Sequence, residues 1–354
     1  MTKNKLFSKL PNKINLDSKI LLLTHTDADG AGATVILKSI FSDVTVKHCT
    51  NALMSREIKT AVTDMDIADQ YDYIIACDIS LNEIDAECVN MTSDKKKLIL
   101  IDHHQTAEGL NKYPFACVQN EILEDSYRID RYKSVNATTG LSSGTSLMYD
   151  YMDYLGLLSN VKNLPLLQEM VHLIASYDTW DWNTIFGKDP IFNEFQSLCN
   201  IYGIDLYEES LLKKLADTDR TDPFDDTDRL LLNIESNKIA SHIESMQKNI
   251  VRASLGLPTP NGNTKYYDVV YSYSNKYLQE SFECMKELFP DVDLYIINYG
   301  TGLSFRAIKP EINVADIVKP YRGGGHAGAG GVKIPFDEQR AYIERTLNAI
   351  LAPI

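Results

Sequence analysis

Aspartates and histidines stand at the ends of several apolar runs in this sequence, where side chains of this kind can bind metal ions. The residues that share this placement are His25, Asp27, Asp29, Asp78, Asp102, His103, His104 and Asp178. Carboxylates brought close together repel one another unless a cation lies between them. Two imidazoles with nearby carboxylates suit Mn²⁺, Fe²⁺ or Zn²⁺, and a mainly oxygen donor set favours Mn²⁺ or Mg²⁺ over Zn²⁺.

Each segment also has a plainer interpretation when it is taken alone. Asp27 and Asp78 would serve as ordinary helix N-caps after buried strands. One of His103 and His104 would make a core hydrogen bond while the other lies on the surface. Asp178, which precedes both tryptophans of the chain, would be a surface acid beside an aromatic cluster.

The first half of the chain alternates apolar runs with helical patterns, and this predicts how the polar residues are positioned. The apolar runs cover 20–25, 44–46, 73–77 and 98–101, and helical spacing occurs near 30–41, 53–62 and 82–91. Continuous apolar strands separated by helices predict a parallel sheet with both faces covered. Ligands bind at the carboxyl ends of the strands in such sheets, where most of these aspartates and histidines stand.

The second half predicts a helical region followed by a smaller α/β domain. Ser142 or Ser143 would cap a helix to about 155, an apolar stripe covers 163–176, the charged stretch 205–230 would be a connector, and a helical pattern over 228–253 leads to a turn cluster at 257–263. Beyond it we expect strands near 267–273, 292–298, 302–308 and 332–335, a helix near 276–288, a glycine-rich loop at 323–331 and a terminal helix from about 337.

Composition limits the classes of partner. The 49 acidic and 35 basic side chains give a net charge of −14, which repels a long nucleic-acid duplex but not a short oligonucleotide in a local pocket. No apolar run approaches the roughly 20 residues that span a bilayer, and the N-terminus lacks signal-peptide features. The six cysteines form no Cys-x-x-Cys pair, so we expect reduced thiols in the cytoplasm.

Taken together, the motifs resemble those of the DHH phosphoesterase superfamily. The signature triplet corresponds to Asp102-His103-His104, and 322–331 resembles the Gly-Gly-Gly-His motif of the DHH-associated C-terminal domain. Ser304-Phe305-Arg306 and 312–315 match the pattern upstream of that motif. The size and motif spacing resemble the oligoribonuclease, or nanoRNase, branch.

The resemblance implies a domain organisation and a place for the active site. We expect a DHH catalytic domain over 1–205 with a parallel sheet, a helical connector over 206–262 and a smaller α/β, DHH-associated substrate-binding domain over 263–354. The active site would lie in the cleft between the two domains. The resemblance leaves a homodimer open.

The resemblance also implies residue roles around two divalent metal ions, Mn²⁺ first and Mg²⁺ or Co²⁺ as alternatives. Asp27 would bind one metal and Asp29 the other, Asp78 and Asp178 would be shared, and His103 and His25 would complete the shells. Asp102 would orient an imidazole, and His104 would face the substrate phosphate. The implied substrate-binding residues are Arg306, Arg322, Gly323, Gly324, Gly325 and His326.

The activity implied by the resemblance is hydrolysis of very short RNA oligonucleotides to nucleoside monophosphates. Paired cations activate water and neutralise the leaving oxygen in such reactions. A phosphodiesterase of cyclic or linear dinucleotide messengers and a phosphoadenosine-phosphate phosphatase are alternatives within the enzyme class. A nucleotide-binding sensor without turnover is the alternative outside it. We expect no membrane partner and no long duplex.

Overall fold

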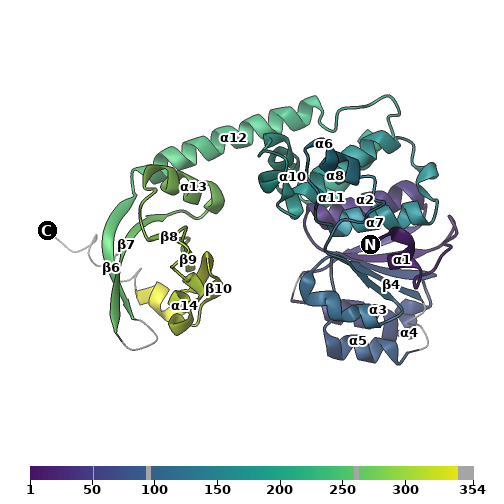
Figure 1. The fold of residues 1–354 in the computed structure, drawn as a ribbon, viewed down its shortest axis with the longest axis horizontal. Helices are drawn as coiled ribbons and strands as arrows, with labels where there is room; N and C mark the ends of the chain where they lie inside the picture. The colour runs from purple at the N-terminus through teal and green to yellow at the C-terminus, as the bar shows by residue number, and fades with distance from the viewer. Residues whose placement is uncertain (51, 93–96, 259–262, 342–354) are drawn as a thin grey trace. The chain divides into compact units, whose positions relative to one another are not determined.

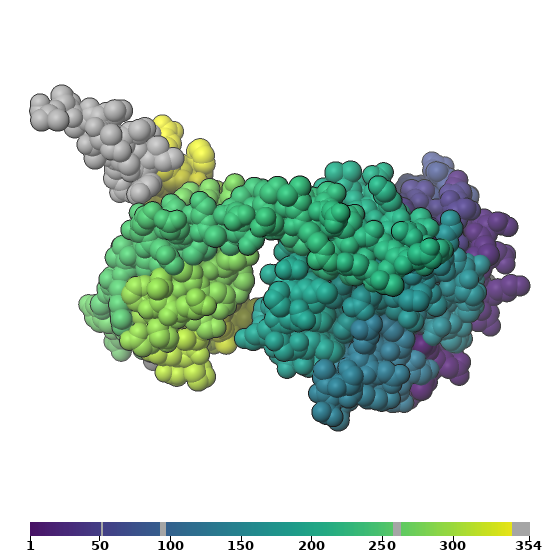
Figure 2. Space-filling view, turned by 90° about the horizontal axis from the view of Figure 1, so that it is seen from above, coloured from purple at the N-terminus to yellow at the C-terminus, as the bar shows by residue number. Residues whose placement is uncertain are grey.

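The computed structural model describes residues 1–50, 52–92, 97–258 and 263–341. The chain divides into two compact units, Met1–Leu232 and Asn233–Ile354. The division falls inside helix α12 (Asp226–Gln247), most of whose side chains are half-buried or exposed, as Figure 2 shows in green. None of the helices in the described residues combines the length and apolarity that crossing a membrane requires.

A five-stranded parallel sheet forms the centre of the first unit (Figure 1). Its strands are β1 (Ile20–Thr24), β2 (Val44–His48), β3 (Tyr73–Cys77), β4 (Leu98–Asp102) and β5 (Ala116–Val118), in the order β2-β1-β3-β4-β5. Every neighbouring pair is parallel, which confirms the sheet predicted from the apolar runs. The carboxyl ends of the strands therefore meet at one edge of the sheet.

Side chains alternate between the two faces of this sheet, and each face has its own core. Leu22, Ile75 and Ile99 face a core formed with α2, α7 and α8, whereas the next residues along the strands face a core formed with α3 and α5. Because β1, β3 and β4 are buried on both faces, their sequences are nearly continuous apolar runs, whereas the edge strand β2 is partly exposed. The helices predicted near 30–41, 53–62 and 82–91 correspond to α2 (Ala28–Ile40), α3 (Met54–Thr63) and α5 (Glu83–Asn90).

The remaining helices of the first unit include the two that reach the ends of the strands. They are α1 (Lys3–Phe7), α4 (Met65–Ala68), α6 (Ile129–Ser134), α7 (Gly144–Tyr154), α8 (Leu164–Asp178), α9 (Asp181–Thr184), α10 (Pro190–Tyr202) and α11 (Ile204–Leu215). Ser143 is the N-cap of α7 and shares a reciprocal capping box with Ser146, so the second of the two predicted cap residues is the one used. Part of the stretch 205–230 differs from a connector, because Tyr207, Leu211 and Leu215 of α11 are buried in the core.

The second unit contains a mixed six-stranded sheet in the order β10-β11-β9-β8-β7-β6. The elements are β6 (Val251–Pro258), β7 (Thr264–Tyr273), α13 (Leu278–Leu288), β8 (Leu294–Asn298), β9 (Gly302–Arg306), α14 (Val314–Val318), β10 (Gly324–His326) and β11 (Ala329–Lys333). Val269 and Phe305 pack on one face with α14, and Val270 and Tyr295 pack on the other with α13. The smaller α/β domain predicted from the sequence is thus present.

Two local predictions for the second unit differ from the structure. The helical pattern over 228–253 ends at Gln247, and strand β6 begins at Val251. The glycine-rich segment 323–331 is a hairpin of β10 and β11 and not an open loop. The predicted turn cluster at 257–263 and the predicted terminal helix fall largely on 259–262 and 342–354, outside the described residues.

Candidate metal centre

The segment after β1 brings an imidazole and a carboxylate together at the start of α2. Asp27 is the N-cap of α2 and accepts a hydrogen bond from the Gly30 backbone N–H at 3.1 Å. The other oxygen of Asp27 lies 2.6 Å from His25 Nδ1. A Cβ on Gly30 would lie 2.3 Å from the His25 carbonyl oxygen, so glycine permits this tight turn. The N-cap interpretation and the ligand interpretation of Asp27 are therefore compatible.

Asp29 is buried in the first turn of α2, where the N-terminus of another helix meets it. Its two carboxylate oxygens accept hydrogen bonds from the backbone N–H groups of Gly144 (2.6 Å) and Thr145 (2.9 Å), the first residues of α7. These N–H groups have no acceptor inside the helix, and the helix dipole favours a negative charge there. The contact holds the Asp29 side chain in place between α2 and α7.

Asp78 follows β3 in an uncommon backbone conformation. Its φ of 61° lies in the left-handed region, which non-glycine residues occupy at a cost and often at functional sites. Its side chain is buried. Burial, together with the charges of Asp29 and Asp27, raises the pKa of Asp78 well above its usual range. A cation at this place would offset the repulsion among these carboxylates.

Asp178 is the last residue of α8 and lies in the same cluster, although it comes much later in the chain than the other ligands. Its Oδ2 atom lies 3.5 Å from Nε2 of His103. Burial, followed by the charges of Asp29 and Asp27, raises the pKa of Asp178 as well. Two carboxyl groups with raised pKa values in one cluster indicate an uncompensated concentration of negative charge.

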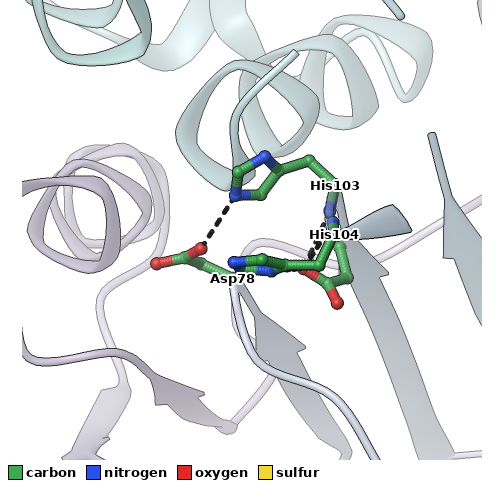
Figure 3. A group of neighbouring side chains, drawn as sticks. Asp78, His103 and His104 are labelled. Atoms are coloured by element: carbon green, nitrogen blue, oxygen red, sulfur yellow. Dashed lines mark hydrogen bonds and ion pairs between the residues drawn. The ribbon is translucent and has the colours of Figure 1, made fainter. Parts of the chain in front are cut away.

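His103 is the residue on which these carboxylates converge. Its Nε2 atom lies 3.2 Å from Asp78 Oδ1, and Figure 3 shows the ring directed at that carboxylate. The same nitrogen lies 3.9 Å from Asp29 Oδ2. Burial lowers the pKa of His103 even though Asp29 raises it. Burial thus favours the neutral imidazole, which is the form that ligates metals.

Asp102 and His104 form a separate pair beside His103. Asp102, fully buried at the end of β4, accepts hydrogen bonds from His104 Nδ1 at 2.7 Å and from the hydroxyl of Ser80. Burial by itself raises the pKa of Asp102, but these hydrogen bonds outweigh it and the net pKa lies below the usual range. The same hydrogen bond raises the pKa of His104. With Nδ1 fixed, Nε2 of this half-exposed ring is the nitrogen that can face a ligand (Figure 3).

The candidate ligand atoms fall into two triads. His25, Asp27 and Asp78 form one, and Asp29, His103 and Asp178 form the other, with all ligand atoms of a triad within 4.8 Å of one another. A third set comprises Asp78, Asp102, His103 and His104. Two oxygen-rich triads with one imidazole each fit hard or borderline divalent cations. All the residues predicted for the first unit's site thus lie together.

Sequence reasoning missed the part played by Gly144 and Thr145. Both hold Asp29 through backbone N–H groups, which any residue type carries. The small residues that follow Ser143 in the sequence were a signal for a close approach, because a Cβ on Gly144 would lie 2.5 Å from the Asp78 Cβ. Glycine is needed here for space.

The residues predicted to bind substrate lie in the second unit, where the sheet aligns two of them. In register, Ala329 of β11 is opposite both His326 of β10 and Arg306 of β9. Residues directly opposite one another share a face of a sheet, so His326 and Arg306 lie on the same face. The Arg306 guanidinium lies over the Phe282 ring of α13, 4.8 Å from its centroid.

The glycine motif itself is shaped by close backbone contacts. Arg322 has a left-handed φ of 59°, and Gly323 donates its N–H to the Val318 carbonyl oxygen at 3.0 Å. A Cβ on Gly325 would lie 2.3 Å from the Ala329 carbonyl oxygen. Arg322 and Gly324 line a pocket of about 490 Å³. Close backbone contacts therefore require glycine at Gly323 and Gly325, whereas a Cβ on Gly324 would meet no atom within 4 Å.

Comparison with known families adds to what the fold and the acidic and histidine cluster indicate. Residues 19–176, all within the first unit, match the DHH family, N-terminal domain. This confirms the resemblance inferred from the Asp102-His103-His104 triplet. The match contains every predicted metal ligand except Asp178.

Individual proteins are also similar to this chain. Oligoribonuclease NrnB of Bacillus subtilis is 27% identical over 326 residues, which cover 91% of this chain and 74% of that protein. The pGpG-specific phosphodiesterase PggH of Vibrio cholerae is similar at a TM-score of 0.48 and 14% identity, covering 94% of this chain and 99% of that one. RecJ of Thermus thermophilus in complex with Mg²⁺ is similar at a TM-score of 0.44 and 12% identity. The match covers 99% of this chain and 53% of the RecJ chain.

Proposed function

We propose that this protein is a metal-dependent phosphodiesterase that hydrolyses very short RNA oligonucleotides to nucleoside monophosphates. The observation that carries the proposal is the pair of ligand triads, His25–Asp27–Asp78 and Asp29–His103–Asp178. The DHH-family match and the similarity to an oligoribonuclease over most of the chain support the same activity.

The two triads would hold two divalent cations, for which Mn²⁺ is our first choice. Such cations, when bound, lower the pKa of water and offset charge on phosphate oxygens. Asp102 keeps His104 oriented through its hydrogen bond to Nδ1 and raises the pKa of that imidazole. His104 is thereby suited to donate a hydrogen bond or a proton to a phosphate oxygen.

Residues of the second unit would bind the remainder of the substrate. Arg306 offers a planar set of donors that matches phosphate oxygens, and His326 lies on the same face of its sheet. The backbone at Gly324 and Gly325 would approach an anion closely because no Cβ intervenes, while Gly323, whose N–H donates to the Val318 carbonyl, would shape the loop that presents them. Only a few phosphates need local neutralisation, so a net charge of −14 is compatible with this substrate.

The six cysteines are all unpaired, which agrees with the reducing cytoplasm we expect for an enzyme of RNA degradation. A homodimer stays an expectation from family resemblance.

The experiment that tests the proposal is incubation of the purified protein and Mn²⁺ with 5′-labelled RNAs of graded length, from dinucleotides upward. We expect release of nucleoside monophosphates from the shortest chains and little product from a long duplex. Cyclic dinucleotide and phosphoadenosine phosphate are parallel substrates that separate the alternative enzymes. Tight binding of a dinucleotide without any product would show a sensor and contradict the proposal.

A further inference from the structure

One aromatic side chain close to the candidate metal centre has no role in the site described above. Trp180 stands in the connection between α8 and α9, and 48% of its surface is exposed. Single exposed apolar residues are common on protein surfaces, so exposure by itself indicates nothing. Three further features of Trp180 indicate a role in binding: its backbone conformation, the packing of its ring and its distance from the metal ligands.

The backbone at Trp180 is in a conformation that tryptophan does not favour. Its φ of 66° and ψ of 7° lie in the left-handed region, where glycine or asparagine is favoured. The connection is held by hydrogen bonds from the Trp180 N–H to the Tyr177 carbonyl at 3.0 Å and from the Asn183 N–H to the Trp180 carbonyl at 3.1 Å. A large ring at such a position indicates that the side chain itself serves a purpose.

The Trp180 ring packs on one side against an aromatic cluster. It makes an edge-to-face contact with Trp182 at 5.4 Å between centroids, and Trp182 stacks on Tyr177 at 5.9 Å. Trp182 packs against the core of the first unit. One side of the Trp180 ring is thus fixed while much of its surface faces solvent, which limits the entropy lost when a ligand binds.

The position of Trp180 places it within a short reach of the candidate metal ligands. Asp178, whose Oδ2 lies 3.5 Å from His103 Nε2, precedes it by two residues. A chain advances at most about 3.6 Å per residue, so the two Cα atoms lie within about 7 Å of each other. A nucleotide with its phosphate at the ligand triads would have its base in the neighbourhood of this ring.

We propose that Trp180 stacks on a nucleobase of the short-oligonucleotide substrate, an inference that rests on the proposed function. Aromatic stacking tolerates any base, because every base presents a π-face. The ring would therefore contribute to the binding of both purine and pyrimidine dinucleotides, and more to that of purines, which stack more strongly. Trp180 is in this account a substrate-binding residue and not a metal ligand.

The test compares two variants of the full-length, Mn²⁺-loaded protein. Trp180→Asn removes the ring but tolerates the left-handed backbone, and Trp180→Phe keeps an aromatic face. We expect Trp180→Asn to raise KM for a diadenosine dinucleotide by about 5- to 100-fold with Mn²⁺ content unchanged, and Trp180→Phe to restore most of the affinity. Tyr266→Asn, at an exposed tyrosine of β7, is the matched control and should leave KM unchanged.

A substrate series separates stacking from a merely structural effect. Dinucleotides with an abasic site in place of the 5′ or the 3′ nucleoside base should bind the wild type more weakly at one of the two positions. At that position, Trp180→Asn should lose no further affinity. An unchanged KM for the intact dinucleotide in Trp180→Asn, or a loss of bound Mn²⁺ in that variant, would overturn the inference.

A wild-type protein that hydrolyses no dinucleotide would contradict the proposed function instead. Trp180 fluorescence then tests the inference independently, in a Trp182→Phe background that leaves a single tryptophan. Stacking predicts that the same dinucleotides quench this fluorescence in a saturable manner. Absence of quenching would overturn the role of Trp180.

Discussion

Gly144 donates its backbone N–H to the Asp29 carboxylate across 2.6 Å, although 115 positions separate the two residues in the chain. The contact joins the start of α7 to the first turn of α2. It holds a buried carboxylate in place next to His103 and Asp178. The geometry of the candidate metal centre therefore depends on a residue that has no functional side chain.

Gly144→Ala tests this dependence. A Cβ at this position would lie 2.5 Å from the Asp78 Cβ and 2.9 Å from Asp29 Oδ2, so both carboxylates would have to move. We expect a loss of about 1–3 kcal/mol in the free energy of unfolding and a fall of about 100-fold in kcat/KM. Chemical denaturation and the dinucleotide assay measure the two effects.

Gly109→Ala is the matched control for that substitution. Its added Cβ would have Glu83 Oε1 at 3.8 Å as its nearest neighbour, an ordinary van der Waals distance. Activity should stay at the wild-type level in this variant. Wild-type activity in Gly144→Ala would show that the site does not need the close approach of α7.

Asp78→Asn replaces the carboxylate whose Oδ1 lies 3.2 Å from Nε2 of His103. Asparagine tolerates the left-handed backbone at this position, so the chain need not rearrange. We expect activity to fall by at least about 100-fold and Mn²⁺ binding, measured by calorimetry, to weaken. Asp130→Asn, at an exposed carboxylate of α6, is the control. Activity of Asp78→Asn within about tenfold of wild type would contradict the ligand assignment.

Arg306→Ala and His326→Ala separate substrate binding from metal binding. Both residues lie in the second unit on one face of its sheet, and neither belongs to a ligand triad. We expect KM for short oligonucleotides to rise by about tenfold or more while Mn²⁺ content stays the same. Lys286→Ala on α13 is the control for a lost surface charge. A fall in metal content at unchanged KM would contradict the assignment of these residues to substrate binding.

The buried histidine of α8 predicts how the stability of the fold depends on pH. Burial, with the nearby charges of Arg128 and Arg131, lowers the pKa of His172 from 6.5 to about 2. The folded protein therefore keeps this ring neutral, whereas the unfolded chain protonates it below a pH of about 6.5. The contribution of His172 to stability is fully present above that pH and is lost as the pH falls.

His172→Phe should remove this part of the acid sensitivity. Between a pH of about 6 and 4, the free energy of unfolding of the metal-free wild type should fall more steeply than that of the variant, by up to about 1.4 kcal/mol per pH unit. Urea denaturation at several pH values measures both slopes. Equal slopes would show that His172 accepts a proton in the folded state.

Much of the candidate site follows from sequence, because the carboxyl ends of parallel strands meet at one edge. Asp78 and His103 come directly after β3 and β4, and Asp27 lies three residues beyond the end of β1. Apolar runs predict those strands well. The family resemblance then implied which of these residues would bind each of the two metal ions. The left-handed φ of Asp78 and the contact of Asp29 with α7 involve the backbone and long-range packing, which no local pattern encodes.

The errors in the second unit have physical causes. Strand β6 carries apolar residues at alternate positions, Val251, Ala253, Leu255 and Leu257, but the preceding helical pattern of α12 runs directly into it. The glycine-rich segment 323–331 was expected to be a loop because glycine weakens strands. Within this segment, β10 pairs with the start of β11, and β11 in turn pairs with β9. These tertiary contacts override the local propensity.

The most direct test of the account is a crystal structure of the Mn²⁺-soaked protein with an anomalous-scattering map recorded at the manganese edge. We predict two peaks, one within coordination distance of Asp27 and Asp78 and the other within coordination distance of Asp29, His103 and Asp178. A map without peaks among these side chains, at a Mn²⁺ concentration that supports activity, would contradict the account.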